Sequence, residues 1–138
     1  MKEKVDINWT ENMSFDGIVN GHTVVIDAKE EVGGENKGPR PKPLLLLALG
    51  GCTGMDVVSI LKKMRVSFEG LKIEVEGDLT EEHPKHYQSM NIIYRFKGKD
   101  LPVEKLEKAV NLSQEKYCGI TFMLSKAADI KHEIVIEE

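Results

Sequence analysis

The chain has few of the features that mark the large specialised classes of protein. Only two of its 138 residues are cysteines, which excludes a scaffold built on several disulfides. Its longest uninterrupted apolar run covers residues 44–49, whereas a membrane helix needs about 20 apolar residues. The first ten residues, MKEKVDINWT, are charged and contain no apolar signal core. We therefore expect a soluble, cytoplasmic protein with no membrane partner.

A strong charge of either sign is also absent. The net charge is −4 although 30% of the residues are charged, and no basic stripe appears along the sequence. A nucleic-acid partner is therefore not expected. The apolar fraction of 41% is sufficient for a hydrophobic core. The length suits one domain, and no repeat or linker divides it, so we expect a single domain over residues 1–138.

Several common catalytic motifs are missing. The sequence contains no GxSxG elbow, which argues against a serine hydrolase, and neither a Walker A loop nor GxGxxG, which argues against a nucleotide site. His83 and His86 have a spacing that suits a metal, but a zinc site needs three or four ligands and no others cluster nearby. We therefore expect neither a cofactor nor a metal site.

The N-terminal third has the pattern of a small antiparallel sheet. Residues 4–10 alternate between apolar and polar side chains, which predicts a half-buried strand. Asn20-Gly21 is a strong hairpin signal between two further strands. Residues 30–43 are rich in glycine and proline and predict an irregular segment, in which GGENKG forms a flexible loop.

A long apolar helix is predicted over residues 43–64. Pro43 is suited to the first position of a helix, and the first half is apolar on all sides, which indicates burial all round. One sheet of a chain this short covers only one face of such a helix. We therefore expect an obligate homodimer with these helices near its centre.

The remaining sequence predicts two strands, two helices and a last strand. Alternating residues 71–76 and 90–96 indicate a long hairpin. A second helix is expected from Pro102 to Cys118, with Gly119 as its C-terminal cap. A short helix over residues 121–127 and a strand over 132–137 follow. The order βββ-α-ββ-αα-β predicts an α+β fold rather than a parallel sheet.

The two cysteines are the candidate reactive groups, although two inert buried thiols would also fit the sequence. Gly50-Gly51, which precede Cys52, leave room for a neighbouring segment or substrate at a cost of about 1 kcal/mol each. If the cysteines act together, Cys52 attacks and Cys118 resolves, because the expected helix C-terminus disfavours a thiolate at Cys118. On the same face, Asp56 would oppose a Cys52 thiolate, whereas Arg40 or Lys42 would favour it.

Two segments resemble a known family. GPRPKPLLLLALGGCTGMDVVSILKK and SQEKYCGITFMLSKAADI resemble the two cysteine motifs of the OsmC/Ohr proteins, the osmotically inducible and organic-hydroperoxide-resistance proteins. ALGGCT is most similar to the OsmC-like branch, and the element order also agrees. The resemblance implies an α+β fold in which antiparallel sheets wrap around a central cysteine-bearing helix, in an intertwined homodimer with sites at the subunit interface.

The resemblance further implies a thiol-dependent peroxidase in oxidative-stress defence. Its substrates would be organic hydroperoxides or hydrogen peroxide, with Cys52 as the peroxidatic cysteine and Cys118 as the resolving cysteine. An external dithiol would then reduce the Cys52–Cys118 disulfide. The family's best-studied peroxidases add an arginine from the N-terminal strands and a glutamate upstream of the first cysteine. Here no arginine precedes Arg40, and Lys42 takes the place of the glutamate, so Arg40 is our candidate for the assisting cation.

Two other functions are compatible with the same residues. The first is a non-enzymatic redox sensor or thiol carrier, which would react once with peroxide without cycling. The second is a small-molecule binding module that uses the apolar cleft of the dimer and has inert cysteines. Thiol counts before and after peroxide treatment distinguish the redox functions from the binding module.

Overall fold

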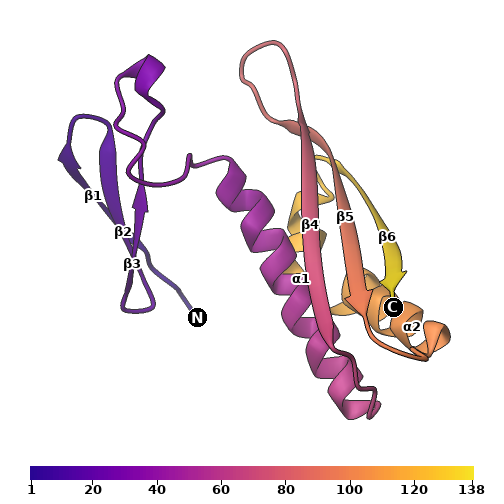
Figure 1. Cartoon of the computed structure of the whole chain (residues 1–138). Helices are drawn as coiled ribbons and strands as arrows, with labels where there is room; N and C mark the ends of the chain where they lie inside the picture. The colour runs from indigo at the N-terminus through magenta and orange to yellow at the C-terminus, as the bar shows by residue number, and fades with distance from the viewer. The chain divides into compact units, whose positions relative to one another are not determined.

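The structure, a computed structural model, describes residues 1–138. Figure 1 shows the elements along the chain. Internal packing divides the chain into two compact units, Met1–Leu45 and Leu46–Glu138, which are described separately below. The first unit contains the N-terminal sheet, and the second contains both cysteines.

The first unit is built on a three-stranded antiparallel sheet in the order β1-β2-β3, with β1 Asp6–Glu11, β2 Ser14–Val19 and β3 His22–Ile26. Asn20 and Gly21 have φ values of 51° and 79°, the two positive values that a type I′ hairpin turn requires, so the predicted hairpin is confirmed. The expected half-burial of the first strand is not found within one chain, because all six residues of β1 are exposed.

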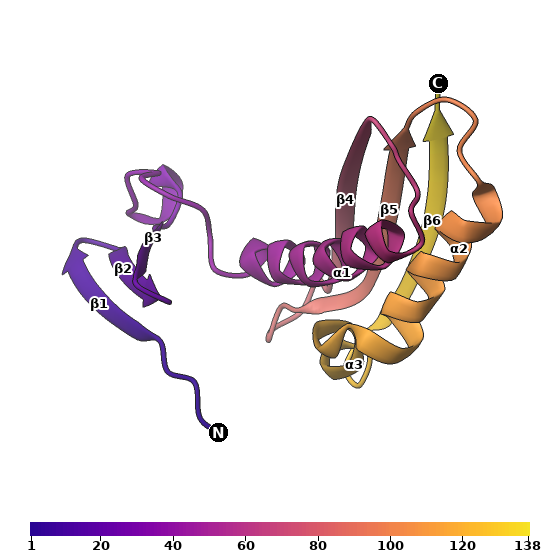
Figure 2. The same cartoon turned by 90° about the horizontal axis from the view of Figure 1, so that it is seen from below.

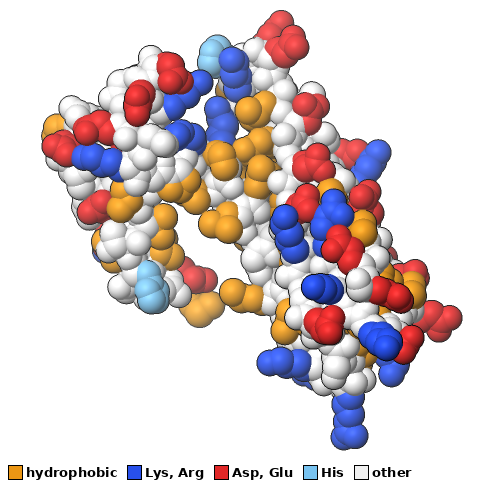
Figure 3. All heavy atoms as spheres, in the orientation of Figure 1, with side chains coloured by type: hydrophobic (Ala, Val, Ile, Leu, Met, Phe, Trp, Pro, Cys, Tyr) orange, Lys and Arg blue, Asp and Glu red, His pale blue; other side chains and the backbone are white.

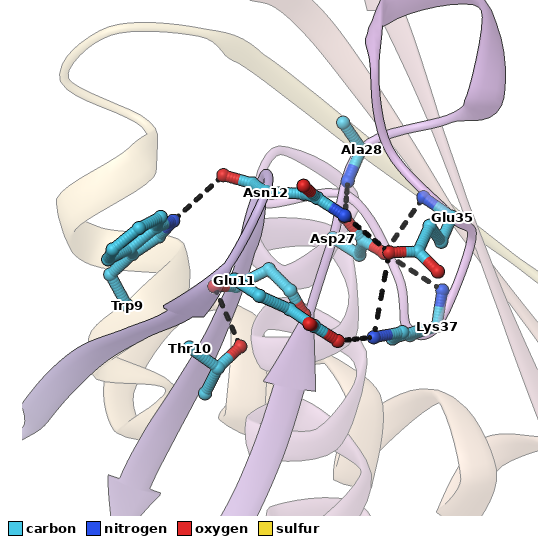
Figure 4. A network of polar contacts seen from close by, with 9 residues as sticks. Trp9, Thr10, Glu11, Asn12, Asp27, Ala28, Glu35 and Lys37 are labelled. Atoms are coloured by element: carbon cyan, nitrogen blue, oxygen red, sulfur yellow. Dashed lines mark hydrogen bonds and ion pairs between the residues drawn. The ribbon is translucent and has the colours of Figure 1, made fainter.

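The segment after β3 is organised around the carboxylate of Asp27. Figure 4 shows this carboxylate accepting the backbone N–H groups of Ala28, Glu35 and Lys37, at 2.7, 3.1 and 3.1 Å. Burial raises the pKa of Asp27, but these hydrogen bonds outweigh it and leave the pKa below its ordinary value of 3.8. The GGENKG loop was expected to be flexible, but hydrogen bonds from its backbone to the Asp27 side chain hold it in place.

Two glycines allow this loop to pack closely against the end of β3. A Cβ atom at Gly34 would lie 2.0 Å from the carbonyl oxygen of Ala28, and one at Gly38 would lie 2.1 Å from that of Val25. Backbone atoms occupy these positions, so no side chain larger than hydrogen fits at either residue. The glycines therefore permit a close backbone approach in addition to interrupting regular structure.

The second unit contains a three-stranded sheet in the order β4-β5-β6, with β4 Gly70–Leu79, β5 Tyr87–Lys97 and β6 Asp129–Glu137. β4 and β5 form the predicted antiparallel hairpin. β6 pairs with β5 in the parallel direction, so the expectation of antiparallel sheets alone was wrong for this sheet. The helices between β5 and β6 provide the long crossover that a parallel pair needs.

The predicted second helix divides before Cys118. It consists of α2, Val103–Leu112, followed by a π-helical turn, η2, Ser113–Tyr117. Cys118 then has an extended conformation and is the N-cap of α3, Gly119–Leu124. Gly119 therefore starts a helix instead of ending one, which corrects the prediction that it is a C-terminal cap.

One face of β5 carries the core. Met90, Ile92, Tyr94 and Phe96 alternate along the strand and are at most 4% exposed, as the period-two pattern predicted. They form one cluster with buried side chains of α1, Pro43–Lys63, and of α2. Figure 2 shows these two helices on the same face of the sheet. The element order and the α+β class are therefore confirmed.

α1 is buried along only one side within a single chain. Its buried residues are Leu49, Thr53, Val57 and Leu61, spaced so that they share one helical face. Away from this face, Leu47 and Met55 are 69% and 77% exposed, and we call this side the open face of α1. Figure 3 shows hydrophobic side chains gathered over the first turns of this helix. By length and composition alone, α1 is also apolar enough to cross a membrane.

Candidate active site

Cys52 lies in the middle of α1, where glycines shape its surroundings. A Cβ atom at Gly50 would lie 3.1 Å from Val75 Cγ2 on β4, whereas a Cβ atom at Gly51 would meet nothing within 4 Å. Gly50 therefore allows close packing of the sheet, and Gly51 borders an apolar groove of about 780 Å³ between α1 and β4. Cys52 itself is partly exposed.

Cys118 lies at the junction of η2 and α3 and is 3% exposed. Its backbone N–H donates to the carbonyl oxygen of Ser113 at 2.8 Å, which closes the π-helical turn. Its sulfur accepts the backbone N–H of Thr121 at 3.3 Å. The thiol is thus at the start of a helix, which corrects the expectation that a helix C-terminus makes Cys118 the weaker nucleophile.

The fold brings the two thiols together although 66 positions separate them. Cys52 Sγ, Cys118 Sγ and a carboxylate oxygen of Asp56 all lie within 4.8 Å of one another. Both cysteines are free thiols. Asp56 follows Cys52 by one helical turn, which places both residues on the same side of α1. This triad is the candidate active site.

A network of buried hydroxyl and amide groups supports the triad. Thr53 Oγ1 lies 2.6 Å from the Tyr94 hydroxyl and 2.7 Å from Ser113 Oγ. Gln114 Nε2 donates to Thr53 Oγ1 at 3.1 Å and to the Tyr94 hydroxyl at 2.9 Å. Ser113 Oγ donates to Asp56 Oδ2 at 2.9 Å. The network thereby connects α1 and β5 to the turn that precedes Cys118.

The carboxylate end of this network fixes the direction of its hydrogen bonds. Because Ser113 donates its only hydroxyl proton to Asp56, Ser113 Oγ must accept from Thr53. Thr53 in turn must accept from the Tyr94 hydroxyl, so the donors run from Tyr94 through Thr53 and Ser113 to Asp56. This order directs three hydroxyl dipoles toward the carboxylate beside the two sulfurs.

The electrostatic surroundings of Cys52 favour its protonated form. Burial raises the pKa of the Cys52 thiol, and the Ile120 backbone N–H opposes this effect. The neighbouring Cys118 and the negative charge of Asp56 raise the pKa further. The sequence-based expectation that Asp56 opposes the thiolate on a shared helix face is therefore confirmed.

Arg40, the third predicted site residue, belongs to the first unit. Its guanidinium donates to the carbonyl oxygens of Asp27 at 3.3 Å and Gly38 at 2.7 Å, and also to Asn36 Oδ1. All three hydrogen bonds are to residues of the same loop. Its proposed action on Cys52 stays a prediction.

Sequence reasoning did not identify the hydroxyl and amide members of the network. Thr53 is an isolated polar residue on the buried face of an apolar helix. This position indicates a buried hydrogen-bond partner and could have identified Thr53 from the sequence. Ser113 and Gln114 lie in SQEKYC just before the second cysteine. Only the fold brings them to Thr53, which is 60 or more positions away in the chain.

Comparison with known proteins agrees with this geometry. The OsmC-like protein family matches residues 34–133, a range that includes both cysteines and Asp56. The chain belongs to the OsmC-like family. The sequence-based resemblance is thereby confirmed, and proteins of this family are generally soluble.

Individual proteins match this chain over nearly their full lengths. Protein YhfA of Escherichia coli K12 is 35% identical over 127 residues, which cover 91% of this chain and 92% of YhfA. A hypothetical protein of Aquifex aeolicus VF5 is 34% identical with a TM-score of 0.84, covering 100% and 99% of the two chains. The organic hydroperoxide resistance protein OhrB of Bacillus subtilis shares the fold, with a TM-score of 0.64 and 17% identity over 96% and 98%.

Proposed function

We propose that this OsmC-like protein is a cytoplasmic thiol-dependent peroxidase that reduces organic hydroperoxides or hydrogen peroxide. The proposal rests on the approach of the Cys52 and Cys118 sulfurs to within 4.8 Å. A peroxide is the proposed oxidant because OhrB, a protein of the same fold, is named for resistance to organic hydroperoxides.

Cys52 is proposed to react first, because it is partly exposed whereas Cys118 is 3% exposed. The Cys52 thiolate attacks the terminal oxygen of the hydroperoxide, the O–O bond breaks, and the alkoxide leaves as an alcohol after taking up a proton. Cys52 becomes a sulfenic acid in this two-electron oxidation. The raised pKa of Cys52 means that only a small fraction is thiolate at neutral pH, so we expect slow turnover.

Cys118 completes the oxidative half of the cycle. Its thiolate attacks the sulfur of the Cys52 sulfenic acid, the S–O bond breaks, and hydroxide leaves as water after protonation. The product is a Cys52–Cys118 disulfide, which requires the sulfurs to approach to about 2.05 Å. An external dithiol then reduces the disulfide by thiol–disulfide exchange and becomes oxidised itself.

The active form is proposed to be a homodimer. The open face of α1 leaves Leu47 and Met55 exposed in one chain, and β1 exposes Ile7 and Trp9 as well. Large exposed apolar patches mark interaction surfaces, and a second copy of the chain is the proposed occupant. Sedimentation equilibrium measures the mass directly, and a monomer at micromolar concentration would end this part of the proposal.

Steady-state consumption of tert-butyl hydroperoxide in the presence of a dithiol tests the activity. We expect many turnovers for the wild-type protein, none for Cys52→Ser, and a sulfenic acid that a dimedone probe traps in Cys118→Ser. Ser59→Ala, an exposed change on the same helix, is the matched control and should retain the wild-type rate. One turnover without cycling would instead identify a redox sensor, and two thiols that stay free in excess peroxide would exclude both redox functions.

A further inference from the structure

The triad offers a second kind of chemistry that does not depend on peroxide. We propose that Cys52, Cys118 and Asp56 together bind one thiophilic divalent cation, of which Zn²⁺ and Cd²⁺ are the representatives. The cluster supplies two sulfurs and one carboxylate oxygen within 4.8 Å of one another. Zinc takes these donor types in proteins, and soft thiolate ligands select such ions over Mg²⁺ or Ca²⁺.

The spacing of the donors is close to that of a coordination sphere. Zinc–sulfur bonds of about 2.3 Å at a tetrahedral angle put two sulfur ligands about 3.8 Å apart. The sulfurs of Cys52 and Cys118 already lie within 4.8 Å, so a side-chain adjustment of about one ångström reaches this geometry. Three protein ligands leave the fourth position for water, as in zinc sites with an open position.

Groups around the triad prepare Asp56 for this role. Ser113 donates to Asp56 Oδ2. Ser113 in turn accepts a hydrogen bond from Thr53, which accepts one from Tyr94. A carboxylate ligand oriented by outer hydrogen bonds is typical of metal sites. The same bonds leave Oδ1 free of any hydrogen bond within the chain, so one carboxylate oxygen remains available to a cation.

The charge around the triad is also suited to a cation. No lysine, arginine or histidine forms an ion pair with Asp56. A bound divalent ion would provide the missing positive charge and displace the protons of both thiols. Lys63 and Lys108 line a groove of about 450 Å³ that reaches Asp56 and gives solvent access. Their charges oppose the cation, but neither amine contacts the carboxylate.

Metal binding and disulfide formation exclude each other at this site. A bound cation draws on one lone pair of each sulfur and makes both sulfurs weaker nucleophiles, so it protects the thiols. Conversely, oxidation by peroxide joins the two sulfurs and removes two of the three ligands, which releases the ion. The same residues would therefore couple the thiol redox state to the free concentration of a thiophilic metal.

Titration of the fully reduced wild-type protein with Cd²⁺, without peroxide, tests the proposal. We expect one equivalent per chain and a thiolate-to-cadmium charge-transfer band in the ultraviolet. A chromogenic chelator measures Zn²⁺ affinity by competition. Cys52→Ser and Cys118→Ser should each abolish the band, and Asp56→Asn should weaken binding about tenfold or more. Asp100→Asn, an exposed carboxylate change in the same unit, should bind as the wild type does.

The outcomes separate this proposal from the peroxidase. Absence of stoichiometric binding in the reduced wild-type protein, or binding that survives both cysteine changes, overturns the metal site whatever the peroxide turnover. Binding that survives Asp56→Asn unchanged overturns the three-donor site. Circular dichroism of each variant establishes that lost binding is not lost folding, and protection of both thiols from alkylation by bound Zn²⁺ is an independent readout. A protein that binds Zn²⁺ but never turns over peroxide would contradict only the proposed activity.

Discussion

A polar network around Thr53 in the second unit and another around Asp27 in the first hold different parts of the chain, namely side chains in the first case and the backbone of a loop in the second. The network around Thr53 is buried and connects three elements of the second unit through neutral hydroxyl and amide groups that end on Asp56. In the network around Asp27, the carboxylate accepts hydrogen bonds from backbone N–H groups of a loop in the first unit. The first positions side chains beside the thiols, whereas the second sets the path of the backbone.

This difference explains why the two networks should respond to different perturbations. In the buried network each hydroxyl has no access to water, so the loss of one partner leaves another group unsatisfied. In the loop network the central group is the carboxylate of Asp27, so protonation at low pH weakens its hydrogen bonds without any mutation.

Replacement of Thr53 by valine should have the largest effect. Thr53 is fully buried and contacts Tyr94, Ser113 and Gln114. The isosteric change removes the hydroxyl and leaves its partners unsatisfied, which should lower the free energy of unfolding by about 1–3 kcal/mol. Urea denaturation of the reduced protein measures it. Thr10→Val, which removes an exposed hydroxyl that donates to a backbone oxygen, is the control and should change stability much less.

Replacement of Asp56 by asparagine should increase the reactivity of Cys52. The negative charge of Asp56 is among the causes that raise the pKa of this thiol. Its removal lowers that pKa and increases the thiolate fraction at neutral pH, by up to about tenfold for each unit of pKa. Iodoacetamide alkylation in a Cys118→Ser background measures Cys52 alone. Asp56→Glu keeps the charge and should leave the rate near that of the parent, and an unchanged rate in the asparagine variant would contradict the electrostatic role.

The Asp27 loop should loosen in acid. The folded pKa of Asp27 lies below its ordinary value of 3.8, so this carboxylate contributes stability above pH 3.8 that is lost as the pH falls through the lower folded value. Pepsin cleavage within residues 27–38, followed by mass spectrometry against pH, measures the opening. Because the activity of pepsin itself depends on pH, the rate is divided by that of an unstructured peptide digested alongside. Asp27→Asn should make this ratio independent of pH in this range. A loop that stays closed well below the lowered pKa would be inconsistent with this account.

The sequence was sufficient for most elements of the fold. Local sequence patterns predicted α1, the β2–β3 and β4–β5 hairpins and the buried face of β5, because each of these patterns depends on neighbours in the chain. The sequence pattern did not predict the direction of β6, because a strand has the same alternation of side chains whether its partner is parallel or antiparallel. The burial of α1 was overestimated for one chain, because composition does not say which element covers a helix.

The candidate site was predictable only where its residues are close in the sequence or are of a distinctive type. The cysteines and Asp56 were identified because reactive residue types are few and Asp56 lies one turn after Cys52. The position of Cys118 was misjudged because a π-helical turn has no distinct sequence pattern, and a glycine after a helical run usually marks its end. Thr53 and Ser113 meet only through tertiary packing.

Replacement of Arg40 by alanine should have the smallest global effect and a clear local one. The guanidinium spans the loop through Asp27, Gly38 and Asn36, so its loss should accelerate hydrogen exchange at the amides of Glu35 and Lys37 and leave the urea midpoint nearly unchanged. Arg40→Lys should restore little of the protection, because an ammonium cannot reproduce a planar fork of donors. Alkylation of Cys52 in the alanine variant then decides the sequence-based role. A slower rate would support assistance to the thiolate, whereas an unchanged rate would limit Arg40 to the loop network.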